Sequence, residues 1–545
     1  MTAGATSEVR LAELVASLSL ATDLGLGQPQ EHVLRQTVIA TRLAAVAGFT
    51  DEQQAAAFYV SLLAWVGCIA DSHELAHWFG DDRRVRADSY DVDRTGLPML
   101  AFLLGHVAPG GPPMRRITMV GRFLTGGFRD AMASFVTHCQ TTGDIADRLN
   151  LPVEVRRGLL EAFERWDGKG VPLGLTGDQI EPVMRVVQVA DDAEVFLRVG
   201  GLSTALGMLR SRSGREFDPH LVDLCVRHDK EIFEDLDTVD AWGVVIGGCS
   251  TLDRRVSDTE LTSVLSTFAD YADIKSPSFL GHSRAVAALA ADAARRAEMS
   301  DEESTLVESA ALVARLGAIG VSTGIWDKPG PLSAMEWERV RTVPYLTERV
   351  LCRQPRLAEL GAVAGMSHER MDGSGYPRGL AGAAIPRTAR LLAAAEMYQA
   401  MSEVRPHRAA LPGPQRESVL LADAAAGRLD AGAVTAVLTA AGHRTARRPQ
   451  LVSGLTGREA EVLALLVRGW SNKQIGKELS ITPRTVGSHV EHIYAKIGVT
   501  TRGAAAMFAM RHGLVDATAL DATASGDTAV GDGAIHEKAP QRSGD

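Results

Sequence analysis

"SHERMDGSGYP" (residues 367–377) decides the fold, because a related stretch, "AFERWDGKGVP" (162–172), lies 205 residues earlier in the chain. The same offset pairs "IEPVMRVVQVADDAEV" (180–195) with "IPRTARLLAAAEMYQA" (385–400). Blocks that repeat in the same order at a constant spacing indicate an internal duplication. We therefore expect two diverged copies of one domain.

An earlier pair of blocks supports the duplication at an offset of 250. "SLLAWVGC" (61–68) pairs with "ALVARLGA" (311–318), and His32 pairs with His282. The difference between the two offsets predicts about 45 additional residues between the blocks of the first copy. Apolar residues recur at helical spacing in both copies, so each is predicted to be helical. "WGVVIGG" (242–248) is the one fair candidate for a strand.

Composition excludes several classes of protein. With 545 residues the chain is too long for one core, and 46% hydrophobic with 23% charged residues is typical of a soluble globular protein. The five cysteines form no Cys-x-x-Cys pair, which favours a reducing compartment. The most apolar stretch, residues 55–70, is too short to span a bilayer. We expect a cytoplasmic protein with no membrane association.

Residues 257–445 resemble an HD-GYP domain, and residues 10–235 resemble it more weakly. The resemblance rests on "GHSRAV" (281–286), "KPGPLSAMEWERVR" (328–341), "HERMDGSGYPRGLAGAAIP" (368–386) and "EVRPHR" (403–408), in family order. It implies a helical module that hydrolyses cyclic di-GMP at a centre of two or three metal ions. Such a centre needs histidine and carboxylate ligands that converge on one cavity.

Most ligand positions implied by the resemblance hold other residues. The second copy keeps His282, whereas the first keeps His32 and Asp191. The substituted positions are Ala314, Arg315, Val343, Ser367 and Glu396 in the second copy, and Ala64, Trp65, Ala162 and Phe163 in the first. Arg315 adds a fixed positive charge where dications would sit, which opposes metal binding. We therefore expect no catalytic residue, no metal ligand and no cofactor, hence a pseudo-phosphohydrolase and not an enzyme.

A retained scaffold without its ligands is typical of a domain kept for binding or signalling. We expect a pocket for an anionic small molecule, such as a nucleotide, lined by His282, Arg315, His368, Glu369, Asp372, Arg390 and Glu396. The two histidines could equally be satisfied core residues, and Glu369, Asp372 and Arg390 could fix loop geometry. Two alternatives stay open: a metal-dependent cyclic-dinucleotide phosphodiesterase with an attached DNA-binding domain, and a scaffold for protein interaction.

Residues 453–514 carry the signals of a helix-turn-helix module. Thr456 with Glu459 and Ser471 with Gln474 form capping boxes, and Thr482-Pro483 supplies an N-cap with proline at the first helical position. Helices are predicted near 457–468, 472–479, 483–497 and 502–512. In the third helix Val486, Val490, Ile493 and Ile497 should pack inward, which leaves the opposite face for the major groove.

"LTGREAEVL" (455–463) and "SNKQIGKELSITPRTVGSHVEHIYAKIGV" (471–499) resemble the LuxR-type DNA-binding domain. Residues 453–514 hold eight basic and four acidic residues inside a chain of net charge −10, as phosphate contact requires. The resemblance implies double-stranded DNA as partner. The implied contacts are Lys473, Arg484, Thr485, His489 and Lys496 at the phosphate backbone, and Gly487, Ser488 and Glu491 at the bases.

The sequence thus predicts an all-α protein: two HD-superfamily helical domains from an internal duplication, followed by a four-helix LuxR-type helix-turn-helix domain. The predicted boundaries are 1–240, 257–445, a linker at 446–452, the DNA-binding domain at 453–514 and a disordered tail at 515–545. The preferred interpretation is a DNA-binding transcriptional regulator that acts as a homodimer. Its degenerate HD-GYP-like region senses a ligand or mediates assembly.

Overall fold

The structure is a computed structural model that describes residues 9–93, 96–108, 113–248, 254–442, 454–512 and 514. Over these residues the fold is helical and contains two strands of two residues each. The predicted all-α class is therefore confirmed. The predicted linker (446–452) and tail (515–545) lie outside the described residues.

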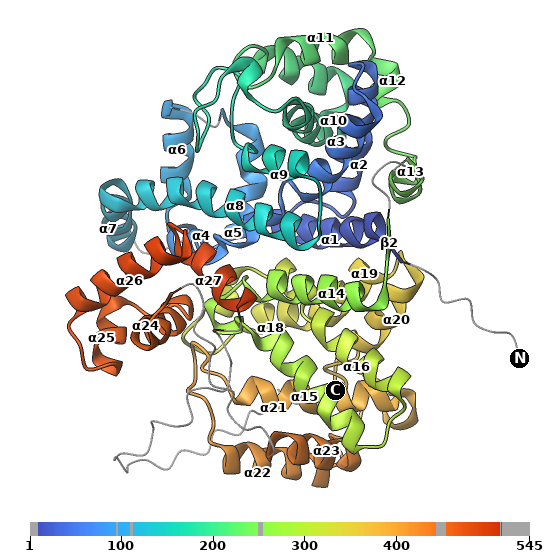
Figure 1. Cartoon of the computed structure of the whole chain (residues 1–545), viewed down its shortest axis with the longest axis vertical. Coiled ribbons are helices and arrows are strands. Elements are labelled where there is room, and N and C mark those ends of the chain that lie inside the picture. Colours follow the sequence, from blue (N-terminus) through green and yellow to red (C-terminus); the bar gives the residue numbers. More distant parts are fainter. Residues whose placement is uncertain are drawn as a thin grey trace, which may run out of the picture.

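The first half of the chain packs its helices around the central pair α2 and α10 (Figure 1). Its α-helices are α1 (Leu11–Leu26), α2 (His32–Val46), α3 (Asp51–Leu63), α4 (Ser72–Phe79), α5 (Asp82–Asp88), α6 (Gly96–His106), α7 (Pro113–Arg122), α8 (Phe128–Arg148), α9 (Val153–Leu160), α10 (Pro182–Arg212), α11 (Pro219–Arg227), α12 (Asp229–Phe233) and α13 (Ala241–Gly248). Short helical turns are η1 (Val66–Ile69), η2 (Ser89–Asp91), η3 (Phe123–Gly127) and η4 (Gly177–Gln179).

The second half packs α15 against α16, α21 and α23. Its α-helices are α14 (Asp258–Asp273), α15 (His282–Arg296), α16 (Asp301–Val313), α17 (Thr323–Trp326), α18 (Ala334–Arg341), α19 (Val343–Leu351), α20 (Pro355–Ala364), α21 (Arg387–Met401), α22 (Gly413–Ala425) and α23 (Ala431–Gly442). Its short turns are η5 (Pro277–Phe279), η6 (Leu316–Gly320) and η7 (Gly382–Ala384).

The two halves repeat each other at the offsets seen in the sequence. Helices α3 and α16 both start with a capping box, Thr50 with Gln53 and Ser300 with Glu303, 250 residues apart. The turns η4 and η7 lie 205 residues apart. Between η1 and α8 the first half carries α4 to α7, where the second half has only α17 and α18 between η6 and α19. The additional residues of the first copy thus form helices.

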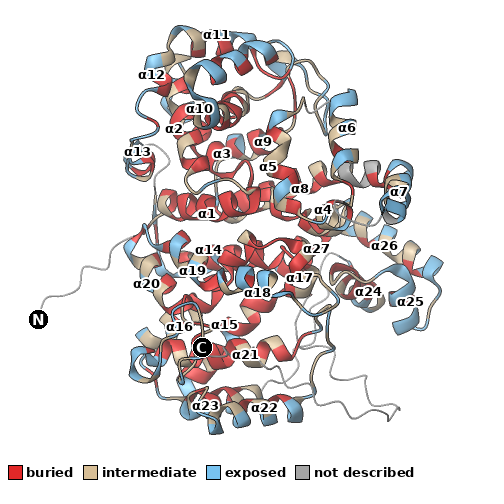
Figure 2. Ribbon diagram, turned by 180° about the vertical axis from the view of Figure 1, so that it is seen from behind, coloured by how far each residue is buried: buried red, intermediate tan, exposed pale blue. Residues whose placement is uncertain are grey.

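The halves meet in a continuous buried interface. Helix α1 packs on η6 and α19, and strands β1 (Val9–Arg10) and β2 (Arg255–Val256) pair antiparallel beside it. At the centre Asp82 of the first half accepts hydrogen bonds from Lys275 Nζ at 2.5 Å and from the Thr323 backbone N–H at 2.9 Å. Figure 2 shows α1 and α14, which flank this interface, as largely buried, whereas α7, α22 and α25 at the periphery expose much of their surface.

The strand predicted at residues 242–248 is wrong, because the structure forms helix α13 (Ala241–Gly248) there. The run is apolar and short, and a short apolar run does not distinguish a strand from a buried helix. Helix α13 packs against α2, where Val245 and Ile246 are buried.

Among the described residues no single helix is both long and apolar enough to cross a membrane. One bent pair, Asp51–Ile69 with Ser72–Phe79, passes that test of length and composition when taken together.

Candidate functional site

Four segments of the second half bring charged side chains together around Phe279 of η5. His282 is the first residue of α15, Glu396 lies on α21, Glu403 and Arg405 follow α21, and Arg315 follows α16. We call these residues with Phe279 the Arg315 cluster. His282, Glu396, Glu403 and Arg315 are all buried.

His282 links two carboxylates in this cluster. Its Nε2 lies 2.9 Å from Glu396 Oε1, and its Nδ1 lies 2.8 Å from Glu403 Oε2. Burial acts to lower the pKa of His282, but Glu396 and Glu403 raise it to about 9. The imidazole is therefore protonated at neutral pH, and both of its N–H groups are donated to carboxylates.

The Arg315 guanidinium completes the cluster and leaves hydrogen-bonding capacity unused. It stacks over the Phe279 ring at 3.8 Å from the centroid, and its Nη1 lies 3.7 Å from Glu396 Oε1. Its Nε and Nη2 are buried and have no hydrogen-bond partner among the described residues. Leaving buried donors unsatisfied is costly, so an acceptor on a bound ligand would stabilise this arrangement.

The other predicted pocket residues divide into two groups. His368 stacks on the Tyr376 ring with centroids 4.9 Å apart, and burial lowers its pKa to about 4. The charges of Glu396, Arg315 and His282 also influence this pKa, so the His368 ring lies near the cluster. Glu369, by contrast, accepts hydrogen bonds from the Arg378 and Leu380 backbone N–H groups.

Asp372 and Arg390 also hold loop geometry. Asp372 accepts from Ser374 N–H at 3.0 Å and from its hydroxyl at 2.6 Å. Arg390 donates to the carbonyls of Ile385 and Gly382. The structure therefore brings His282, Arg315, His368 and Glu396 together, and places Glu369, Asp372 and Arg390 on the adjoining loop.

Three residues of the cluster were absent from the predicted pocket: Phe279, Glu403 and Arg405. The Arg405 guanidinium also lies over the Phe279 ring, 4.7 Å from its centroid, and Arg405 Nη2 donates to Glu403 at 2.7 Å. The segment "EVRPHR" contains both charged residues and could have identified them.

The first half repeats the arrangement with its own histidine. His32 Nδ1 lies 2.5 Å from Glu194 Oε2, and its Nε2 lies 3.2 Å from Asp191 Oδ1. Burial acts to lower the pKa of His32, but Asp191 and Glu194 raise it to about 10. In place of Arg315 stands Trp65, whose Nε1 donates to Gln36.

The resemblance to HD-GYP domains implies a metal centre, and the residues present do not fit one. Both ring nitrogens of His282 are hydrogen-bonded to carboxylates, so neither is available to a metal ion. Arg315 places a positive charge 3.7 Å from Glu396. Within the part of the chain that the structure describes, no group of three or more His, Cys, Asp or Glu side chains could hold a metal ion.

The C-terminal module forms the four predicted helices. They are α24 (Gly457–Val467), α25 (Asn472–Glu478), α26 (Pro483–Ile497) and α27 (Arg502–Arg511). Both predicted capping boxes are present, and Thr482 accepts from the Thr485 N–H at the start of α26. Val486 and Ile493 are buried against the other helices.

The opposite face of α26 is open. Arg484, Thr485, Ser488 and Glu491 are exposed, as is Lys473 on α25, while Gly487 and His489 are partly buried. Lys496 differs, because its Nζ donates to Glu459 Oε2 at 2.7 Å. This ion pair holds α26 to the start of α24, so Lys496 also has a partner within the domain.

Two segments of the chain match known domain families. Residues 266–431 match the family described as HD domain, and residues 453–509 match the family described as bacterial regulatory proteins, luxR family. The chain thus combines an HD domain with a C-terminal LuxR-type helix-turn-helix domain, which implies DNA binding.

Particular relatives resemble each part. The 3'3'-cGAMP-specific phosphodiesterase 3 of Vibrio cholerae is 29% identical over 74% of this chain and 88% of its own length. The response regulator protein VraR of Staphylococcus aureus is 38% identical over 14% of this chain and 38% of its own length. A crystal structure of cyclic GMP-AMP specific phosphodiesterase from V. cholerae (V-cGAP3) has the same fold, with a TM-score of 0.57 at 24% identity over 81% of this chain and 99% of its own.

These relatives overturn the expectation that the chain is a pseudo-phosphohydrolase and not an enzyme. The similarity to a named phosphodiesterase extends over both helical halves, which indicates enzymatic function. The expectation relied on matching single ligand positions to one pattern, and such matching cannot detect a site built from other residues.

Proposed function

We propose that this protein is a DNA-binding transcriptional regulator whose second helical half recognises a cyclic dinucleotide at the Arg315 cluster. The main support for this proposal is the buried Arg315 guanidinium, two of whose nitrogens lack a hydrogen-bond partner among the described residues. Guanidinium groups bind phosphate oxygens through paired, charge-assisted hydrogen bonds.

The surroundings of Arg315 support a ligand that combines phosphate with a flat base. Phe279 and Trp326 present aromatic rings 3.8 Å and 5.6 Å from the guanidinium carbon. His368 and Tyr376 form a second stack close by. Aromatic rings beside cations favour nucleotides, and the similarity to a 3'3'-cGAMP-specific phosphodiesterase supports the cyclic dinucleotide class.

Calorimetric titration of the full chain with 3'3'-cGAMP, cyclic di-GMP and GMP tests this assignment. We expect saturable binding of a cyclic dinucleotide that is at least tenfold weaker in Arg315→Met, because one charge-assisted contact is lost. Arg295→Met is the matched control, since Arg295 is 64% exposed and pairs with Asp292 on its own helix. No heat from any cyclic dinucleotide, or equal binding by both variants, contradicts the proposal.

Hydrolysis of the bound cyclic dinucleotide is a second candidate function, favoured by the similarity over 74% of the chain. Incubation of the same samples with and without added manganese, followed by chromatography, separates the two. A linear product that accumulates beyond one equivalent per chain establishes turnover. Binding without product supports ligand recognition alone.

For DNA binding, we propose that α26 enters the major groove and that two copies of the chain bind paired half-sites in the cytoplasm. Lys473, Arg484, Thr485, His489 and Lys496 would contact phosphates. Gly487, Ser488 and Glu491 would face the bases, where Glu491 could accept from cytosine N4.

A further inference from the structure

The first half contains a cavity of about 620 Å³ at the position that the Arg315 cluster occupies in the second half. Asp191, which corresponds to Glu396, lies in its wall. Two large apolar residues line it where the second half has polar ones: Trp65 corresponds to Arg315, and Phe163 corresponds to His368. The volume lies within the range of small-molecule sites.

Two walls of the cavity are apolar. On one side Phe135 of α8 packs edge-to-face on Phe163 with centroids 4.6 Å apart, and Trp65 lies 6.0 Å from Phe163. On the other side α6 contributes Leu100 and Leu103 with neighbouring apolar residues. Helix α6 belongs to the additional residues of the first copy, so this wall has no counterpart in the second half.

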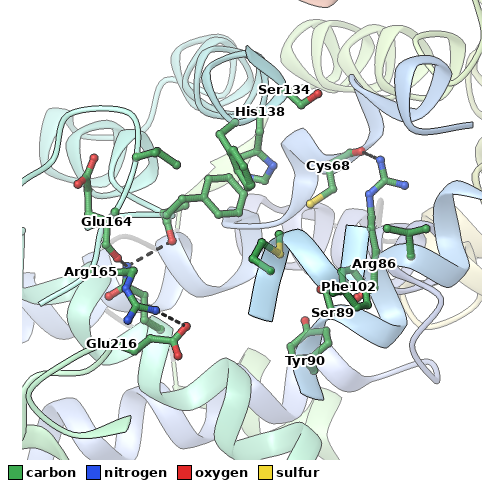
Figure 3. A pocket seen from close by; sticks show the side chains of 18 of the residues that line it. Cys68, Arg86, Ser89, Tyr90, Phe102, Ser134, His138, Glu164, Arg165 and Glu216 are labelled. Carbon is green, nitrogen blue, oxygen red and sulfur yellow. Dashed lines mark hydrogen bonds and ion pairs between the residues drawn. The ribbon is translucent and has the colours of Figure 1, made fainter. Parts of the chain in front are cut away.

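The charged residues in the wall already have partners, as Figure 3 shows for Arg86 and Arg165. Arg86 pairs with Asp71 at 2.5 Å and with Asp82 at 3.0 Å. Arg165 lies 3.2 Å from Asp167. Asp191 is held by His32 and by the Tyr90 hydroxyl. Transfer of a phosphate into such surroundings would be unfavourable, because the buried cations are already paired. The lysine of the lining, Lys169, is 70% exposed and lies 3.7 Å from Asp167.

His138 of α8 supplies a polar atom without a partner. Its Nε2 donates to the Ala64 carbonyl at 2.6 Å, and its Nδ1 is buried and lacks a partner among the described residues. Burial lowers the pKa of His138 to about 3, so the ring is neutral and Nδ1 is a hydrogen-bond acceptor. Figure 3 places His138 on the cavity wall beside Ser134, opposite Tyr90 and Phe102.

We propose that the first helical half binds a small, neutral, largely apolar molecule in this cavity, with a hydroxyl or N–H group of the ligand donated to His138. Apolar area removed from water supplies the affinity, and the single acceptor orients the ligand. The proposal concerns a different half and a different ligand chemistry from the Arg315 cluster, and it does not rest on the proposed function.

The cavity shares part of its wall with a second hollow that borders the DNA-binding domain. Ser134 and Asp71 line it and also line a second hollow, of about 320 Å³, between the first half and the end of α26. Tyr494, Thr501 and Arg502 form the far side of that hollow. A ligand that displaces α8 would therefore act on the contact that holds the DNA-binding domain.

Fluorescence titration of the full chain with N-phenyl-1-naphthylamine tests the proposal, because this neutral probe is apolar and carries one N–H. We expect saturable binding of one probe per chain. Leu103→Trp fills the cavity and should weaken binding at least tenfold. Leu100→Trp, at a half-buried position of the same wall, should do the same with less strain. Leu421→Trp is the matched control, at a leucine that is 49% exposed in the second half.

A second comparison tests the role of His138. The N-methylated probe, which has no donor, should bind the wild type several-fold more weakly than the parent probe. His138→Phe should bind the two probes equally. Circular dichroism and thermal unfolding establish that each variant is folded. Absence of saturable binding, or equal binding by the wild type and by folded Leu100→Trp, overturns the proposal, since the probe would then occupy exposed apolar residues outside the cavity, such as Met114 or Ile117.

Discussion

His282 illustrates how one side chain sets the character of a buried site. Held between two carboxylates, it is protonated at neutral pH, and its two N–H groups face oxygens that could otherwise bind cations. Arg315 adds a second cation on the same side of Glu396. Together they turn the retained core of an HD domain into a site whose unused donors suit an anion.

The protonated state of His282 predicts a dependence of stability on pH. Its pKa is raised from 6.5 to about 9 on folding, so its contribution is fully present below pH 6.5 and is lost as the pH rises through 9. We expect His282→Gln to be less stable than the wild type at pH 6.5, by about 3 kcal/mol. The difference should shrink toward pH 9, as measured by urea unfolding at several pH values.

The two carboxylates do not change this pH window. Burial acts to raise the pKa of Glu396 and Glu403, but His282 and the nearby arginines lower it below the ordinary value, so both groups stay charged across the window. His220→Gln is the matched control, at an exposed histidine. A constant difference between His282→Gln and the wild type across the pH range would contradict a charged His282.

The exposed position of Arg484 predicts that this residue contributes to DNA affinity and to its dependence on salt concentration. It is exposed on the open face of α26, so Arg484→Ala should weaken binding to any duplex and reduce the slope of log affinity against log salt by about 1. Fluorescence anisotropy with a random-sequence duplex at several salt concentrations measures both quantities. Arg295→Ala serves as the control, and an unchanged salt slope in Arg484→Ala would argue against phosphate contact.

Among the elements, the junction of α5 with the second half depends on one carboxylate. Burial acts to raise the pKa of Asp82, but Lys275 and Arg86 lower it below the ordinary value, so the group is charged at neutral pH. Asp82→Ala leaves Lys275, which is fully buried, without its counter-charge. We expect a loss of about 3–5 kcal/mol in the free energy of unfolding, measured by urea titration.

Asp81→Ala is the matched control for this prediction. Asp81 precedes Asp82 and caps α5 through hydrogen bonds to the Arg83 and Arg84 N–H groups. Its loss should cost only about 1 kcal/mol. An equally small loss in Asp82→Ala would show that the buried ion pair does not hold the two halves together.

Elements with local signals could be predicted from the sequence, and contacts between distant segments could not. Capping boxes at Thr456 and Ser471 located α24 and α25 to within a residue. The constant offsets indicated which segments of the two halves correspond, as α3 and α16 do. The roles of Glu403 and Arg405 depend on how the segment after α21 folds back onto Phe279. The periodicity of apolar residues in the sequence does not indicate such a contact between distant segments.

The same limit explains why the cavity of the first half was not predicted. Trp65 and Phe163 were recognised as replacements of expected ligands, but the sequence did not indicate that they line an empty volume. That volume depends on where α6 packs, and α6 lies in the part of the first copy that has no repeat to compare. Residue types indicated the chemistry of the wall, whereas the cavity volume depends on how several helices pack, α6 and α8 among them.

In the whole molecule, the DNA-binding domain rests on the first half through α27 and α8. Thr137 Oγ1 donates to Thr501 Oγ1 at 2.5 Å, and Arg511 lies 3.9 Å from Asp144. The helix-turn-helix module has a basic excess, whereas the rest of the chain carries the excess of negative charge. Docking therefore holds the face proposed to bind DNA close to a body whose net negative charge repels DNA.

Gly503, the second residue of α27, allows this contact to be tested. A Cβ at Gly503 would lie 2.6 Å from Thr137 Cγ2 and 2.8 Å from the Ala70 carbonyl oxygen, so a larger side chain cannot dock. Leucine also favours the helix more than glycine does. We expect Gly503→Leu to release an intact DNA-binding domain and to raise the affinity for a random-sequence duplex roughly threefold or more, because the undocked, binding-competent population increases.

Gly457→Leu is the control for that release, because a Cβ at Gly457 meets nothing within 4 Å. Limited proteolysis between residues 442 and 454 gives a second readout, which should be faster in Gly503→Leu and unchanged in Gly457→Leu. The salt dependence of DNA binding should also steepen in Gly503→Leu if repulsion by the body is relieved. Equal DNA affinity and equal proteolysis in both variants would mean that docking of α27 on α8 does not restrain the DNA-binding domain.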